Sequence, residues 1–166
     1  MTEQPSASSY PPPGSTVQRV TARVLPVNSE NRVLLLHGWE PKHPERTFWF
    51  TIGGAVEERE DLRTAGAREL AEETGIVIDP ADLGETLGEQ LNAFDWDEWH
   101  LEQSETYYAI RVDAEADLSG LDGLEQETID RAGWLTPDEL DADGTAANPG
   151  ITAMMRRAIA RVGTRT

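Results

Sequence analysis

Residues 54–76 read GAVEEREDLRTAGARELAEETGI, and this stretch contains the strongest structural signals in the 166-residue chain. Asp61 is a suitable N-cap, because its carboxylate can accept hydrogen bonds from the free amide groups of a first helical turn. Apolar or small residues recur every fourth position from Leu62 to Leu70, which predicts a stripe that packs on a core. Gly75 suits the left-handed conformation that commonly ends a helix. The stretch therefore predicts a loop followed by one amphipathic helix.

Acidic side chains crowd one side of that helix. At about 100° per residue, Glu69, Glu72 and Glu73 fall within an arc of roughly 100°. Carboxylates placed so closely repel each other, and a hard divalent cation with a preference for oxygen ligands relieves that repulsion. We expect them to face outward, where the carbonyl of Gly54 and the carboxylate of Glu60 could join the same cation. The alternative is a solvated helix face that binds nothing.

The complete order of these residues resembles the 23-residue signature of the Nudix hydrolases. Five residues separate Gly54 from Glu60, and seven more precede Arg68, which is followed by Glu-Leu-Ala-Glu-Glu-Thr-Gly-Ile. Every fixed position of the signature is matched. The resemblance implies an α/β fold, namely an α/β/α sandwich with a mixed β-sheet, over residues 17–166.

The resemblance also implies an activity and a set of site residues. Members mostly hydrolyse a diphosphate linkage in a nucleoside diphosphate derivative or a nucleoside triphosphate, by attack of water at phosphorus with Mg²⁺ or Mn²⁺. The implied metal ligands are Glu69, Glu72, Glu73 and the Gly54 carbonyl. Arg68 would be a salt-bridge partner that orients the cluster, and Glu60 would support it, so we count both with the catalytic group.

Two other functions are compatible with the same fold. One is a non-catalytic nucleotide-binding regulator, a class that usually loses the acidic residues retained here. The other is an isopentenyl-diphosphate isomerase, whose chemistry is associated with a catalytic cysteine. This chain contains no cysteine. The hydrolase is therefore the leading hypothesis.

The amino-acid composition limits the classes of molecule that the protein is expected to bind. The chain has 14 Lys and Arg against 31 Asp and Glu, a net charge of −17. Such acidity argues against binding a nucleic acid polymer or an anionic membrane surface. The small nucleotide substrate is what the family resemblance implies, and cations would have to screen its charge from this acidic protein. Without a basic start or a long apolar run, we expect a cytoplasmic protein. The oligomeric state stays open, a homodimer included.

Substrate-binding residues are predicted from the few cations and the aromatic residues near the signature. Arg23 and Arg46 could bind a phosphate bidentately, although a surface ion pair is the commoner role. Trp96 and Trp99 could stack on a base, or pack on the core at a turn between strands.

A later acidic residue could add a further carboxylate to the site. Some members of the family take a base from a later loop, and Glu125 or Glu127 lies where one could fall. We select Glu127 as an additional metal ligand, against the alternative of an acidic surface loop. Glu69 is a second candidate for the base.

The rest of the chain reads as alternating elements around this helix. Residues 1–16 are rich in Pro and Ser and predict a disordered tail. The remaining predictions are strands at 17–27, 32–37, 47–52, 85–94, 106–112 and 132–135, loops at 40–46 and 113–127, and helices at 136–140 and 151–159.

Overall fold

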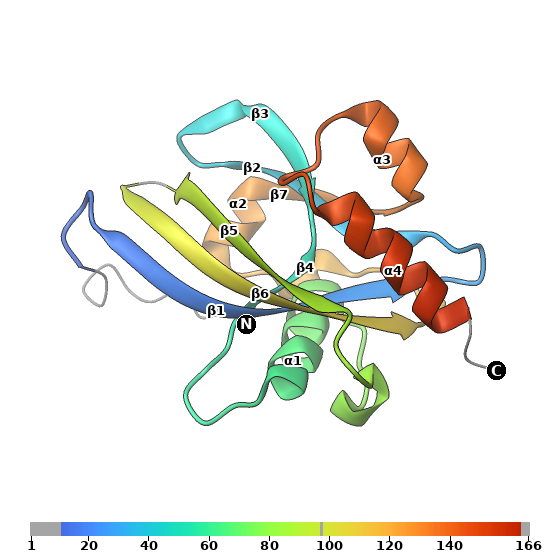
Figure 1. The fold of residues 1–166 in the computed structure, drawn as a ribbon. Coiled ribbons are helices and arrows are strands. Elements are labelled where there is room, and N and C mark those ends of the chain that lie inside the picture. The colour runs from blue at the N-terminus through green and yellow to red at the C-terminus, as the bar shows by residue number, and fades with distance from the viewer. Residues whose placement is uncertain (1–10, 97, 164–166) are drawn as a thin grey trace.

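A mixed sheet of seven strands forms the centre of the computed structural model, which describes residues 11–96 and 98–163 (Figure 1). The strands are β1 Thr16–Val27, β2 Val33–Glu40, β3 His43–Phe50, β4 Ile52–Ala55, β5 Gly88–Trp96, β6 Trp99–Arg111 and β7 Ile129–Leu135. The helices are α1 Leu62–Thr74, α2 Gly123–Thr128, α3 Pro137–Asp143 and α4 Ile151–Gly163, with short 3₁₀ turns η2 Pro80–Leu83 and η3 Leu118–Gly120.

The sheet has the spatial order β3-β2-β1-β6-β5, with β4 paired to β1 and β7 paired to β2. The long β1 and β6 run parallel, whereas the other strand pairs are antiparallel. The predicted mixed sheet is therefore confirmed.

Helices cover both faces of the sheet, and β2 shows why. Val33 and Leu35 pack in the layer under α4, whereas Leu34 and Leu36 pack in the layer over α1. A strand buried on both faces is apolar throughout, as residues 33–36 are. Figure 1 shows α1 and α4 on opposite sides of the sheet, which confirms the α/β/α sandwich.

Helix α1 begins and ends close to where the sequence predicts. The Asp61 carboxylate accepts from the Thr64 amide at 2.8 Å, and Gly75 takes a left-handed φ of 74°. A Cβ at Gly66 would lie 2.9 Å from the Val24 side chain, so a glycine lets the helix pack closely on β1. This contact places the glutamates of α1 beside the sheet.

Three segments differ from the expectation. The predicted loop at 40–46 is mostly strand, because β2 and β3 continue until Glu40 pairs with His43. Part of the acidic 113–127 segment forms α2, which a capping box between Asp122 and Glu125 starts. Residues 11–16 of the predicted tail hydrogen-bond to the β5–β6 hairpin, and residues 1–10 lie outside the described residues.

No described helix is long and apolar enough to cross a membrane.

Candidate active site

Four glutamates form what we call the acidic cluster: Glu60, Glu69, Glu72 and Glu73. Three of them bind Arg68. The guanidinium donates from Nε and Nη2 to Glu60 at 2.7 and 2.8 Å, and from Nη1 to Glu69 at 2.9 Å and Glu72 at 3.3 Å. The hydrogen bond from Arg68 lowers the pKa of Glu60. Arg68 therefore joins the loop before α1 to the acidic face of the helix.

Glu69 is fully buried next to the end of β4. A Cβ at Gly54 would lie only 2.7 Å from Oε1 of Glu69, so the position has room for the carboxylate only because residue 54 is glycine. The expectation that all three helix glutamates face outward is therefore wrong for Glu69 and Glu73. The paired glycines leave space for carboxylates between helix and sheet, a long-range contact that helical spacing does not show.

Glu73 is the member of the acidic cluster whose surroundings oppose its negative charge. Its side chain is 3% exposed, and its Oε1 accepts from the amide of Gly53 at 2.9 Å. Burial raises the pKa of Glu73 well above its usual range, and the carboxylates of Glu69 and Glu125 raise it further. A positive charge at this point would offset both effects.

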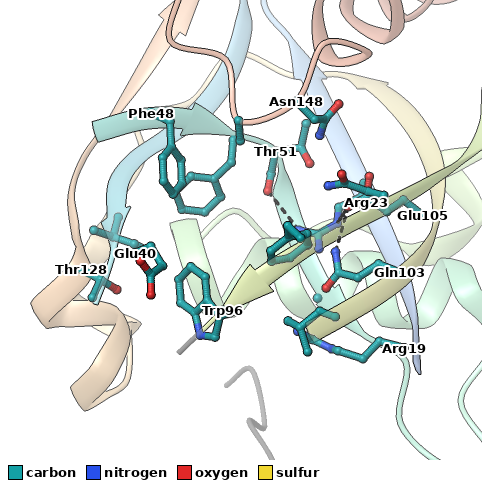
Figure 2. A pocket seen from close by; sticks show the side chains of 18 of the residues that line it. Arg19, Arg23, Glu40, Phe48, Thr51, Trp96, Gln103, Glu105, Thr128 and Asn148 are labelled. Atoms are coloured by element: carbon teal, nitrogen blue, oxygen red, sulfur yellow. Dashed lines mark hydrogen bonds and ion pairs between the residues drawn. The ribbon is translucent and has the colours of Figure 1, made fainter. Parts of the chain in front are cut away.

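A cavity of about 320 Å³ opens beside Glu73. Figure 2 shows Phe48 and Trp96 on one side of it, and Arg23 with Glu105 on the other. The aromatic residues that line it are Trp39, Phe48, Phe50, Phe94 and Trp96. Gly54 and Glu73 line it from the signature, and Gly53 lines it from the position just before the signature. The cavity therefore joins the acidic cluster to a wall of aromatic rings.

Two of the four predicted substrate-binding residues line this cavity. Arg23, on β1, and Trp96, at the end of β5, both contribute to its wall. Arg46 does not, because it lies on the exposed outer part of the β2–β3 hairpin. Trp99 does not line it either, since its indole N–H donates to the Pro11 carbonyl at 2.9 Å.

Of the two later carboxylates that the sequence offers, Glu125 lines the cavity and the predicted metal ligand Glu127 does not. Glu127 is exposed and does not line the cavity, whereas Glu125 lines it and acts electrostatically on Glu73. The reason is that residues 123–128 form a helix, on which positions two apart point in nearly opposite directions. A loop, as the sequence predicts, would not separate the two side chains in this way.

A family model described as the NUDIX domain matches residues 17–155. The chain belongs to the Nudix family. Membership supports a hydrolase that acts on diphosphate linkages in general. Comparison with curated proteins found no match.

Solved structures share the fold of this Nudix protein. The MutT protein from Methanosarcina mazei Go1 has a TM-score of 0.61 and 22% identity, over 90% of this chain and 98% of that one. A MutT Nudix hydrolase from Burkholderia pseudomallei has a TM-score of 0.61 and 20% identity, over 85% and 98%. The E. coli dihydroneopterin triphosphate pyrophosphohydrolase has a TM-score of 0.60 and 18% identity, over 87% and 99%.

Nudix hydrolases generally use a divalent metal, and the acidic cluster fits one in its chemistry. The ligand atoms that it offers are carboxylate oxygens, which hard cations prefer. A cation would also stabilise the charged form of the buried Glu73. Across residues 11–96 and 98–163, no three acidic, histidine or cysteine side chains converge as a metal site. Arg68 instead bridges Glu69 and Glu72. A cation would therefore compete with Arg68 for these two carboxylates.

Part of the cavity of this Nudix protein is absent from the sequence-based prediction. Gln103 and Glu105 line it from β6, and Asn148 lines it from the segment before α4. The predicted strand begins only at residue 106, so the alternation of Gln103, Glu105 and Tyr107 on one face was missed. Extending the strand back by this alternation would have indicated a polar face.

Proposed function

We propose that this Nudix protein hydrolyses a diphosphate linkage in a nucleoside diphosphate derivative or a nucleoside triphosphate, by attack of water at phosphorus with Mg²⁺ or Mn²⁺. One observation carries the proposal: a single cavity contains the buried Glu73 and the Gly54 backbone together with an aromatic wall. A diphosphate with a base attached needs both kinds of surface.

The metal ligands in this proposal are Glu69, Glu72, Glu73 and the carbonyl of Gly54. When bound, divalent ions would neutralise phosphate oxygens and lower the pKa of a water molecule. Arg68 donates to both Glu69 and Glu72 and so holds their carboxylates near each other before a cation arrives.

Residues on three other elements would handle the substrate. Arg23 would bind a phosphoryl oxygen, and Trp96 would stack on the base from the aromatic side of the cavity. The carboxylate of Glu125 would accept a proton from the attacking water, since it lines the cavity and comes from a separate element. Glu69 is less suited to that role because it already accepts from Arg68 at 2.9 Å.

A substrate screen tests the proposal. The panel should contain nucleoside triphosphates, dinucleoside polyphosphates and nucleotide sugars, with released phosphate measured after coupling to a phosphatase. Two structural neighbours are named for compounds of this kind, a dihydroneopterin triphosphate pyrophosphohydrolase and a C. elegans Ap4A hydrolase. We expect Mg²⁺-dependent turnover of at least one class. Binding of nucleotides without turnover of any would contradict the proposal and favour a regulator.

A further inference from the structure

Strand β6 carries a row of three buried polar residues, two of which line the cavity, and the proposed reaction gives none of the three a role. Gln103, Glu105 and Tyr107 alternate along the strand and share one face. Their exposed fractions are 3%, 3% and 0%. Burial of such groups is costly unless each has a hydrogen-bond partner, so their arrangement requires an explanation.

Glu105 is the centre of the row. Its Oε1 accepts from the Tyr107 hydroxyl at 2.9 Å, and its Oε2 accepts from Nε2 of Gln103 at 3.0 Å. Burial raises the pKa of the Tyr107 phenol, and the Glu105 carboxylate raises it further, so Tyr107 remains a donor. Nε of Arg23 lies 3.7 Å from Oε2 of Glu105. The two neutral donors therefore hold the carboxylate against the arginine, as Figure 2 shows for Gln103.

Arg23 is restrained along its whole length. Nε donates to Oγ1 of Thr21 and Nη1 to the carbonyl of Thr51, each at 3.3 Å. A Cβ at Gly53 would lie 2.9 Å from Cδ of Arg23, so the glycine gives the side chain its path across β4. Among the described residues, no hydrogen bond occupies Nη2, and Arg23 lines the cavity next to Glu73. The end of the guanidinium therefore remains available to a ligand.

We propose that Glu105, held by Tyr107 and Gln103, positions the Arg23 guanidinium so that Nη2 of Arg23 donates a hydrogen bond to a phosphoryl oxygen in the cavity. This inference rests on the proposed function, in which Arg23 binds phosphate. A free arginine side chain loses rotamer freedom when it binds, and one already held by the protein loses less. Glu105 and Tyr107 are thus positioning residues that need not touch the substrate.

Tyr107→Phe tests this role, because it removes one hydroxyl group from the row. Tyr108→Phe is a matched control: Tyr108 is 3% exposed, but it packs in the layer over α1, on the opposite face of β6. The probe is Mg²⁺ with imidodiphosphate, which resists hydrolysis, and its Kd is measured by calorimetry. The set is completed by Arg23→Ala and by the double variant Arg23→Ala/Tyr107→Phe.

The effects of Tyr107→Phe and Arg23→Ala on binding are expected to be coupled. Arg23→Ala should weaken binding by about 10- to 100-fold, as for loss of a charge-assisted hydrogen bond. Tyr107→Phe should weaken it by about 3- to 10-fold, and Tyr108→Phe by less than about 2-fold. In the Arg23→Ala background, Tyr107→Phe should add nothing, because its effect passes through Arg23.

Each contrary result has a distinct meaning. Unchanged binding in Tyr107→Phe, or the same loss with and without Arg23, would overturn the positioning role and leave a purely structural one. Failure of the wild-type protein to bind imidodiphosphate would overturn it as well. Coupled binding without turnover of any compound in the nucleotide screen would refute the proposed function while supporting the positioning of Arg23.

Discussion

Glu73→Gln is expected to stabilise the metal-free protein while it removes most of the turnover. The glutamine keeps an oxygen that can accept from the Gly53 amide, which lies 2.9 Å from the present carboxylate. It removes an ionisable carboxyl group that is 3% exposed and whose charged form is disfavoured by burial, Glu69 and Glu125. The wild-type protein retains a carboxyl group at this buried position, in our account, because a bound cation requires it.

The sign and size of the stability change follow from linkage. A carboxyl group whose pKa is raised by folding destabilises the folded protein at pH values above its unfolded pKa. That penalty grows by about 1.4 kcal/mol per pH unit until the folded pKa is passed. It is absent near pH 4 and present at pH 7. Glu73→Gln removes this penalty, so its Tm at pH 7 should exceed that of the wild type, by about 2–4 °C for each kcal/mol gained in a chain of this size.

Calorimetric melting in EDTA at several pH values between 4 and 8 measures the effect. Glu127→Gln is the control, since Glu127 is exposed and does not line the cavity. Its Tm should change by less than about 1 °C. Added Mg²⁺ should stabilise the wild-type protein, by about 2.7 kcal/mol at 100 times Kd, and should stabilise Glu73→Gln less. A Tm for Glu73→Gln below that of the wild type in EDTA at pH 7 would refute the reasoning.

Four further outcomes are expected. Glu60→Gln should lower the Tm at pH 7, and by progressively less as the pH falls below the ordinary pKa of a glutamate, because a pKa lowered by Arg68 gives stability that is lost on acidification; an equal loss at every pH would exclude this cause. Turnover should require Mg²⁺ or Mn²⁺ and stop with chelator, and a chelator-resistant rate would indicate another mechanism. Arg59→Gly should raise the Tm by about 1–3 °C, because Arg59 has a left-handed φ of +66° that glycine adopts without strain. Glu58→Gly is the control and should lower the Tm; a similar fall in both variants would show that Arg59 is unstrained. Deleting residues 1–15 should lower the Tm by about 2–4 °C, because residues 11–15 hydrogen-bond to the β5–β6 hairpin; an unchanged Tm would show that these bonds add no stability.

Local patterns predicted the parts of the fold that local chemistry determines. The Asp61 cap and the left-handed Gly75 set the limits of α1, and the apolar run of residues 33–36 indicated a strand buried on both faces. These features depend on neighbours a few residues away, so they are visible in a sequence. The capping box of α2 was equally local, but the acidity of the surrounding segment favoured a loop.

The site could be predicted only as far as its residues lie close in sequence. The glutamates of α1 form such a set, and their order identified the family. The direction of Glu69 depends on Gly54 across the gap between helix and strand. Likewise, Trp96 lines the cavity whereas Trp99 hydrogen-bonds to Pro11, which is 88 residues away from Trp99 in the sequence. Contacts of this kind follow from the topology, which spacing does not report.

Anomalous diffraction from crystals soaked in Mn²⁺ tests the central claim most directly, because it locates the cation without reference to a substrate. The account predicts a strong peak within coordination distance of Glu69, Glu72 and Glu73, with Arg68 displaced from at least one carboxylate. A data set with no peak at these residues, while the Arg68 ion pairs stay intact, would contradict it.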